Sequence, residues 1–377
     1  MGGDSNQVDP HVLKKYEILH EIGRGAYGVV WKARVRKTGE IVALKKIISA
    51  FQNDTDAQRT FREVMFLQEM NHEHIIRLWN VLKANNDKDL YLVFEFMDTD
   101  LHQVIRSGIL EEIHKRYVVY QTLKALYYMH SGELLHRDLK PSNLLLNSEC
   151  LLKVADYGLA RSIASLQTET VANPVLTDYI ATRWYRAPEI LLGSTQYTKG
   201  IDMWSVGCIL GEIYLGQALF PGTSTMNQLD KIIEVTGRPS PADIASIESP
   251  FASTMLESLP PSRPRDLADL IPSAPPDALD LLRKMLAFNP AKRISAQEAL
   301  AHPYLDQFHN EDEEPARDSP IEIIIADDEK MSVSVYRDRL YSEIVKRKKE
   351  IRNRALKKRR EKHRKEGREE AEAEEDE

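Results

Sequence analysis

One eight-residue run constrains this chain more than any other part of its sequence. From His136 to Asn143 the chain reads His-Arg-Asp-Leu-Lys-Pro-Ser-Asn, which places an acid, a cation and an amide close together. Such a set suits transfer of a phosphoryl group, because positioned cations stabilise the charge that spreads over its oxygens in the transition state. We expect Asp138 to accept or orient the proton of an attacking hydroxyl, Lys140 to neutralise charge on the moving group, and Asn143 to hold Mg²⁺.

A second motif, Asp156-Tyr157-Gly158, follows the first along the chain. We expect Asp156 to supply the second set of Mg²⁺ contacts. Tyr157 stands where phenylalanine is usual in this motif. Its ring can still pack, but a buried tyrosine hydroxyl needs a hydrogen-bond partner.

The N-terminal part holds a glycine-rich run, Gly23-Arg-Gly-Ala-Tyr-Gly-Val-Val30. Alone it is a weak indication, because a dinucleotide-binding helix opens with the same spacing and a flexible hairpin turn is the plainer alternative. The β-branched residues that follow favour a second strand, so we expect a hairpin whose backbone N–H groups approach phosphate oxygens. The residues expected to bind the nucleotide here are Ile22, Gly23, Arg24, Gly25, Ala26, Tyr27, Gly28, Val29 and Val30.

The run Val42-Ala-Leu-Lys45 puts a lysine into an apolar strand, where an ammonium group needs a partner. Glu63, on a helix expected over 60–69, is the candidate partner, and Lys45 would then hold the α- and β-phosphates. A surface lysine is the plainer alternative. Lys46 competes for the role, although the match to V-A-I-K favours Lys45.

The organisation of the chain follows from its length and its change of pattern. With 377 residues it exceeds what one hydrophobic core supports. We expect an α+β, bilobal fold, because strand patterns precede and helical patterns follow the join near Glu95. The expected parts are an N-terminal extension (1–15), a small β-rich lobe with one main helix (16–97), and a larger helical lobe (98–304).

Beyond residue 304 we expect a segment that packs on the rest (305–345) and a charged tail (346–377). Ile321, Ile323, Ile324 and Ile325 favour a strand, and an apolar side recurs at helical spacing through Tyr336, Leu340, Tyr341, Ile344 and Ile351. The tail carries fourteen Lys and Arg against three Glu over 346–368, and then seven acids. It is read as a nuclear localisation signal, as a stripe that binds an anionic partner such as RNA or tubulin, or as a solvated, exposed helix or disordered segment.

The composition excludes several classes of protein. Two distant cysteines, Cys150 and Cys208, exclude a disulfide framework and a zinc cluster, and favour a reducing compartment. No apolar run approaches the roughly 18 residues of a membrane span. We therefore expect a soluble cytoplasmic protein, a monomer, with nuclear or cytoskeletal association through the basic tail as alternatives.

Taken together, these ordered motifs resemble the eukaryotic protein kinase family over about 16–304. The run Thr177-Asp-Tyr, followed by Ala181-Thr-Arg-Trp-Tyr-Arg, resembles the activation lip of MAP kinases. Runs at 51–59, 131–136 and 221–229 resemble the atypical extracellular-signal-regulated kinases seven and eight, the MAP kinase fifteen group. Asp178 departs from the glutamate common there. The resemblance implies a Ser/Thr kinase that uses ATP and Mg²⁺ on Ser-Pro and Thr-Pro sites of proteins.

The resemblance also implies roles for the lip. Phosphates on Thr177 and Tyr179 would activate the protein, and members of this group typically add these phosphates themselves. Each phosphate would order the loop through arginines. The arginines expected to bind these phosphates are Arg62, Arg137 and Arg161 for Thr177, and Arg183 and Arg186 for Tyr179.

Further implied roles concern adenine, the fold and docking. Glu95 and Met97 would bind adenine through backbone atoms, with Phe94 as the gatekeeper behind the pocket. Glu189 would pair with Arg293, and Asp202 would brace the loop that carries Asp138. Glu311, Asp312, Glu313 and Glu314 resemble the site that receives basic docking peptides, with an ordinary solvated charge run as the alternative.

A pseudokinase scaffold that binds partners without chemistry is the competing interpretation. The presence of five residues argues against it: Lys45, Glu63, Asp138, Asn143 and Asp156.

Overall fold

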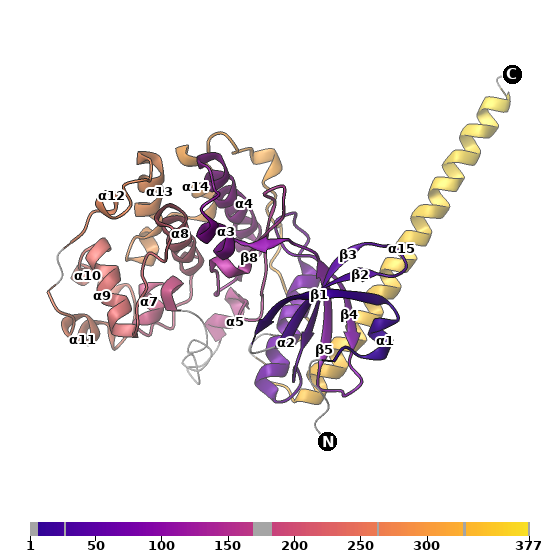
Figure 1. The fold of residues 1–377 in the computed structure, drawn as a ribbon, viewed down its shortest axis with the longest axis horizontal. Coiled ribbons are helices and arrows are strands. Elements are labelled where there is room, and N and C mark those ends of the chain that lie inside the picture. Colours follow the sequence, from indigo (N-terminus) through magenta and orange to yellow (C-terminus); the bar gives the residue numbers. More distant parts are fainter. Residues whose placement is uncertain (1–6, 26–27, 169–182, 262–263, 327–328, 376–377) are drawn as a thin grey trace.

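The computed structural model describes residues 7–25, 28–168, 183–261, 264–326 and 329–375, and it has the two expected lobes (Figure 1). The small lobe is built on an antiparallel five-stranded sheet in the order β1-β2-β3-β5-β4. Its strands are β1 (Tyr16–Gly25), β2 (Gly28–Val35), β3 (Ile41–Ile47), β4 (Leu78–Lys83) and β5 (Leu90–Glu95). β3 lies between β2 and β5 and sets Lys45 opposite Val30 and Leu92.

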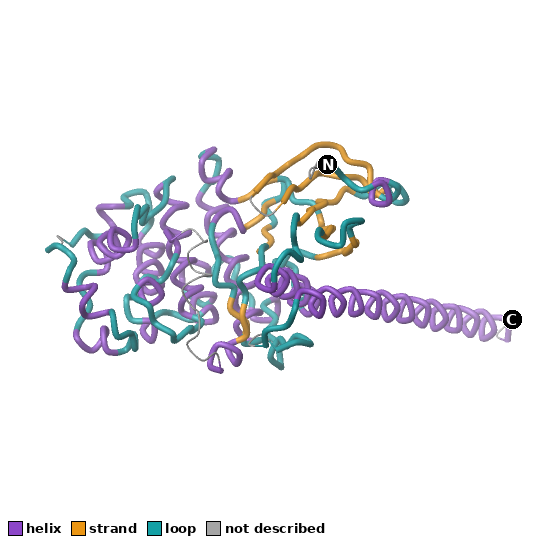
Figure 2. Tube along the Cα trace, turned by 90° about the horizontal axis from the view of Figure 1, so that it is seen from below, coloured by secondary structure: helices purple, strands orange, loops and turns teal. Residues whose placement is uncertain are grey.

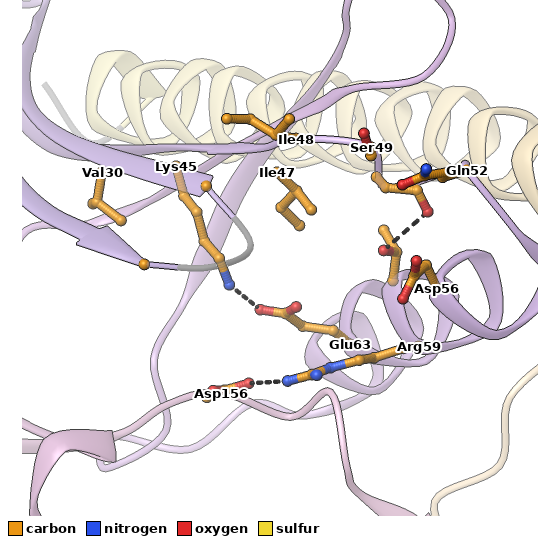
Figure 3. A pocket seen from close by; sticks show the side chains of 14 residues that line it. Val30, Lys45, Ile47, Ile48, Ser49, Gln52, Asp56, Arg59, Glu63 and Asp156 are labelled. Carbon is orange, nitrogen blue, oxygen red and sulfur yellow. Dashed lines mark hydrogen bonds and ion pairs between the residues drawn. The ribbon is translucent and has the colours of Figure 1, made fainter. Parts of the chain in front are cut away.

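The main helix of the small lobe is α2 (Asp54–Glu69), which begins six residues before the helix expected from the apolar pattern. Its first turn is polar and is fixed by a cap, since the Asn53 side chain accepts a hydrogen bond from the backbone N–H of Asp56. Its inner face buries Phe61, Val64 and Leu67. This packing orients Glu63 toward the sheet (Figure 3). A short helix, α1 (Pro10–Leu13), precedes β1 and buries Val12.

The large lobe is mostly helical, and its elements surround α8, whose residues from Ile201 to Tyr214 are buried. Its longer helices are α3 (Leu101–Ser107), α4 (Glu112–Ser131), α8 (Gly200–Leu215), α9 (Thr225–Thr236) and α13 (Pro276–Met285). The shorter ones are α5 (Ile163–Thr168), α7 (Pro188–Leu191), α10 (Pro241–Ala245), α11 (Ala252–Glu257), α12 (Leu267–Leu270) and α14 (Ala296–Leu300). Single 3₁₀ turns lie at Pro141–Asn143, Arg183–Tyr185, Pro290–Lys292, Pro303–Leu305 and Glu311–Glu313.

Short strands near the join of the lobes flank the two loops that carry the His136–Asn143 run and the Asp156 motif. β6 (Thr99–Asp100), β8 (Leu144–Leu146) and β9 (Leu152–Val154) form one small sheet, and β7 (Leu134–Leu135) pairs with β10 (Arg161–Ser162). The run from His136 to Asn143 therefore lies between β7 and β8. The Asp156 motif follows β9 directly.

The C-terminal extension returns to the small lobe. The prediction of a strand at Ile321–Ile325 is wrong, because the described residues between 314 and 332 contain no helix or strand. Ile321 and Ile325 are nevertheless buried, and the Ile321 N–H donates to the carbonyl of Gly132. A Cβ on Gly132 would lie 2.7 Å from the Ile321 side chain, so a larger residue there would force that buried side chain to move.

The chain ends in one long helix, α15 (Val333–Glu375), whose first turns pack beside α2 before it projects from the molecule (Figures 1 and 2). The rings of Phe61 and Tyr336 lie 5.4 Å apart, and those of Phe51 and Tyr341 6.2 Å apart. The helix continues without a break across residues 345 and 346, where a separate tail was expected to begin. Among the described helices, none combines the length and apolar character that crossing a membrane requires.

Candidate active site

The loop between β7 and β8 brings three of the predicted residues together. Lys140 Nζ lies 2.7 Å from Asp138 Oδ2, and Asn143 Nδ2 lies 3.3 Å from the same oxygen. Asn143 also donates to the backbone carbonyl of Asp138 at 2.8 Å. These contacts hold the Asp138 carboxylate in one orientation with a cation beside it.

Asp202 on α8 fixes the backbone of this loop, as expected. It is fully buried, and it accepts hydrogen bonds from the backbone N–H groups of His136 and Arg137, both at 2.9 Å. His130 Nε2 lies 3.0 Å from the same carboxylate. Burial alone would raise the pKa of Asp202, but these hydrogen bonds hold it below its usual value. Arg137 has a φ of 68°, a left-handed conformation that costs energy and needs such support.

Lys45 and Glu63 meet across the gap between β3 and α2 (Figure 3). Lys45 Nζ lies 2.9 Å from Glu63 Oε1. Burial favours the neutral amine, yet the carboxylate of Glu63 outweighs it and raises the pKa of Lys45, which stays charged. Lys46 lies 3.3 Å from Asp89 and donates to the carbonyl of Gln7, so the competing lysine is engaged on another part of the lobe.

Asp156 has a φ of 65°, and its carboxylate lies 3.9 Å from the guanidinium of Arg59 (Figure 3). Burial raises the pKa of Asp156, but Lys45 and Arg59 more than compensate and lower it. Sequence reasoning missed Arg59. The available signal was its position one helical turn before Glu63, which puts both side chains on one face of α2. A Cβ on Gly158 would lie 2.6 Å from Arg59 Nε, so glycine makes room for this arginine.

A cavity of about 420 Å³ opens beside these groups (Figure 3). The glycine-rich strands, β3, α2 and the Asp156 motif all contribute to its wall, through Gly25, Gly28, Val30, Lys45, Glu63 and Asp156. Gly28 has a φ of 153°, and a Cβ there would lie 1.9 Å from the carbonyl oxygen of Lys46. Only glycine fits this turn. Ala26 and Tyr27 lie outside the described residues.

The residues expected to hold Mg²⁺ fit a hard cation, which prefers carboxylate and amide oxygens. Among the described residues, no hydrogen bond uses the amide oxygen of Asn143, since its contacts run through Nδ2. The backbone N–H of Ala155 donates to the Asn143 carbonyl at 2.9 Å. This bond ties together the two segments that carry Asn143 and Asp156.

The residues expected to bind adenine lie where β5 leads into the large lobe. Phe94 and Met97 are buried, and Ile22 on β1 is 43% exposed. The Glu95 carboxylate accepts from the Arg77 N–H at 2.7 Å and pairs with Lys153 at 3.1 Å. Its side chain is therefore engaged elsewhere, which leaves the backbone for the expected role.

The arginines expected to bind phosphates lie on α2, on the loop between β7 and β8, on β10, and on or directly after the 3₁₀ turn Arg183–Tyr185. Arg62 on α2 and Arg161 on β10 are buried. Arg137 donates to the Leu159 carbonyl at 3.4 Å, and Arg183 donates to the Thr223 carbonyl at 3.3 Å. Arg186 is partly buried. Thr177 and Tyr179 lie outside the described residues, so the structure does not place them against these arginines.

The acidic segment expected to receive docking peptides differs from the expectation at one residue. Glu311, Asp312 and Glu313 are exposed on their 3₁₀ turn, but Glu314 is 7% exposed. Its carboxylate accepts from the Asn310 N–H at 3.1 Å and lies 3.0 Å from His309 Nδ1. Glu314 therefore serves the turn itself, and we correct the acidic surface to the other three carboxylates.

The expected pair of Glu189 and Arg293 is present and joins α7 to the turn before α14. Two parallel contacts of 2.6 Å link the carboxylate and the guanidinium, and both side chains are almost fully buried. This pair links two parts of the large lobe and does not line the cavity beside Lys45.

Comparison with known proteins agrees with this geometry. The sequence pattern of the protein kinase domain matches residues 16–305. The chain therefore belongs to the protein kinase family.

Individual relatives define its branch. Extracellular signal-regulated kinase 2 of Dictyostelium discoideum is 69% identical over 92% of this chain and 95% of that protein. Mitogen-activated protein kinase 15 of Xenopus laevis is 55% identical over 92% of this chain and 59% of that one. Extracellular signal-regulated kinase 7 of Drosophila melanogaster is 44% identical over 93% and 39%. The chain is thus a Ser/Thr protein kinase of the MAP kinase type, similar to the atypical extracellular-signal-regulated kinases.

Proposed function

We propose that this MAP kinase transfers the γ-phosphoryl group of Mg-ATP to Ser-Pro and Thr-Pro sites of protein substrates. One observation carries the proposal, namely that Asp156 lines one cavity with the Lys45–Glu63 pair while its neighbour Ala155 donates a hydrogen bond to Asn143, in the loop of the Asp138–Lys140–Asn143 contacts. Lys45 holds the α- and β-phosphates. Asn143 and Asp156 hold Mg²⁺, which neutralises charge on the phosphates.

The transfer step needs no covalent intermediate on the protein. The substrate hydroxyl oxygen forms a bond to the γ-phosphorus, and the bond from that phosphorus to the bridging oxygen of ADP breaks. Asp138 orients the hydroxyl and accepts its proton, while Lys140 offsets the charge of the moving group.

Replacing Asp138 separates this proposal from a binding scaffold. Asp138→Asn should lower kcat for phosphorylation of myelin basic protein by several orders of magnitude and leave the affinity for Mg-ATP nearly unchanged, because Asp138 touches the hydroxyl and not the nucleotide. Calorimetry measures the binding. Near-normal turnover in the variant would end the assignment, and a wild type that binds ATP without turnover would favour the pseudokinase scaffold.

The preference for proline after the acceptor residue is proposed from the Ala181–Arg186 stretch and from a small hollow beside it. That hollow is lined by Asp138, Tyr185, Arg186 and Tyr197 among others. A prolyl residue brings no N–H that must be satisfied there. A peptide array without enrichment of Ser-Pro and Thr-Pro would reject this preference.

Activation is proposed to follow autophosphorylation of Thr177 and Tyr179. The two phosphates would recruit Arg62, Arg137, Arg161, Arg183 and Arg186. Expression in bacteria, beside Asp138→Asn, tests this route by mass spectrometry. An unmodified wild type, or equal modification of both proteins, would point to an external activating kinase.

Two surfaces are proposed to bind partners. Glu311, Asp312 and Glu313 present exposed carboxylates that suit basic docking peptides. The basic part of α15 suits an anionic partner, through which the protein, otherwise proposed to be a cytoplasmic monomer, would reach the nucleus or the cytoskeleton. Charge reversal at the three acids should weaken the binding of a basic docking peptide without changing the turnover of short peptide substrates.

A further inference from the structure

The hydroxyl of Tyr157 has a partner that a phenylalanine could not use. Tyr157 is fully buried, and its Oη donates to the backbone carbonyl of Val154 at 3.2 Å. The same carbonyl accepts from the Ile76 N–H at 3.0 Å, and the Val154 N–H donates to the His74 carbonyl at 2.8 Å. Val154 thus joins β9 of the large lobe to the loop between α2 and β4, and the Tyr157 hydroxyl bonds to this junction.

The backbone on the N-terminal side of Asp156 is hydrogen-bonded at both N–H groups and both carbonyls of Val154 and Ala155. The Ala155 N–H donates to Asn143, and the Ala155 carbonyl lies 3.0 Å from His136 Nε2. The rings of His136 and Tyr157 lie 5.0 Å apart. Asp156 sits among these bonds in a left-handed conformation, with a φ of 65°. Such a conformation persists only where its surroundings fix it.

We propose that the Tyr157 hydroxyl is a positioning group, which holds Asp156 in its metal-binding orientation by opposing the departure of the Tyr157 ring from its buried site. This inference rests on the proposed role of Asp156 as a Mg²⁺ ligand. An ordinary hydrogen bond contributes enough to change the ratio of held to released ring by about 2- to 12-fold.

Removal of the hydroxyl is a clean change here. In Tyr157→Phe the Val154 carbonyl keeps its bond from Ile76, so no buried acceptor is left without a donor. The variant should fold with nearly the wild-type midpoint of thermal unfolding. Its effect should be local: the segment around Asp156 should open more often than in the wild type.

Hydrogen exchange followed by mass spectrometry measures this opening without a ligand. The amides of Val154, Ala155 and Ala160 are all hydrogen-bonded, and they exchange when the segment opens. We expect peptides covering 154–160 to exchange about 2- to 12-fold faster in Tyr157→Phe, with peptides of α4 and α8 unchanged. Tyr304→Phe is the matched control, because Tyr304 is also fully buried and its hydroxyl lies 3.1 Å from that of Tyr214. It should leave 154–160 unchanged.

A second measurement adds Mg²⁺ and a non-hydrolysable ATP analogue. The metal then holds Asp156 itself, so the difference between Tyr157→Phe and wild type should shrink toward zero. Equal exchange of the ligand-free proteins would overturn the proposal. Faster exchange throughout the molecule, or a difference that persists with the ligand bound, would show a structural role only. If the analogue bound neither protein, the proposed function would fail, while the ligand-free comparison would still decide whether the hydroxyl holds the segment.

Discussion

Lys45 Nζ lies 2.9 Å from Glu63 Oε1, and this contact is made only while α2 sits against the sheet of the small lobe. The C-terminal extension contacts α2 at both ends. Near its start, the side chain of Asp54 accepts a hydrogen bond from the Val333 N–H at 2.9 Å. At its end, Arg317 donates to the Glu69 carbonyl at 3.1 Å. The lysine–glutamate pair therefore depends on residues far away in the sequence.

The first prediction concerns the pair itself. Lys45→Met removes a positioned cation from the phosphates, and we expect kcat/KM for peptide phosphorylation to fall about 100- to 1,000-fold. Glu63→Gln keeps the shape but removes the charge that raises the Lys45 pKa, and it should give a smaller loss. Steady-state kinetics with varied ATP measure both. Lys46→Met is the comparison variant, because it breaks the contact with Asp89. It should lower the stability of the protein and leave turnover per folded molecule unchanged. The reverse pattern, with Lys46 essential and Lys45 dispensable, would assign phosphate binding to Lys46 and a structural role to Lys45.

The second prediction concerns the packing of α15 on α2. Tyr336 is 1% exposed, its ring contacts Phe61, and its hydroxyl donates to the Glu329 carbonyl at 2.8 Å. Tyr336→Ala should lower the free energy of unfolding by about 3–5 kcal/mol and loosen α2, with loss of kcat. Urea denaturation and hydrogen exchange of α2 measure these effects. Val345→Ala, on an exposed side of the same helix, should change neither. Wild-type exchange and turnover in Tyr336→Ala would mean that α2 is held without this contact.

The motifs of the site could be predicted from the sequence because each lies within a short run whose residue types are dictated by the chemistry. The partner Glu63 could be chosen because α2 carries it at the right distance along the chain. Arg59 could not be identified in the same way, since its contact with Asp156 depends on how α2 approaches another lobe. The isoleucines at 321–325 favoured a strand by composition, yet no free sheet edge pairs with them in the described residues. Ile321 and Ile325 are buried instead in an irregular crossing, with Ile321 against Gly132, while Ile324 is exposed. Glu314 was assigned to the surface because a run of acids gives no sign of which one turns inward.

The third prediction concerns the buried pair of Glu189 and Arg293. Arg293→Ala leaves the Glu189 carboxylate buried without its cation, and we expect a loss of about 3–5 kcal/mol in the free energy of unfolding. Arg293→Lys retains the charge but loses the two parallel contacts, so it should recover only part of that loss. Chemical denaturation measures both. Arg283→Ala is the matched control, because Arg283 pairs with Asp266 at 3.0 Å on the surface and should cost about 1 kcal/mol or less. Equal losses for the two alanine variants would contradict the burial argument.

The last prediction concerns acid stability and two histidines in the loop between α2 and β4. Burial lowers the pKa of His72 to about 3 and that of His74 to about 4, with Glu73 opposing the shift and Lys124 and Lys153 adding to it. The buried Nε2 of His72 has no hydrogen-bond partner among the described residues. The unfolded chain takes up protons on both rings near pH 6.5, whereas the folded protein does not until the pH approaches 4 or 3.

The free energy of unfolding should therefore fall as the pH is lowered from about 6.5 to 5, by up to about 1.4 kcal/mol per pH unit for each histidine. His72→Gln should reduce this slope, and replacement of the exposed His20 by Gln should leave it unchanged. Urea denaturation at several pH values above 5 measures the slope before the carboxylates titrate. A slope that is the same in wild type and His72→Gln would mean that His72 gains a proton in the folded state as readily as in the unfolded chain. The loop would then have to open to solvent in the folded protein, because the closed arrangement gives the imidazolium no place to be hydrated.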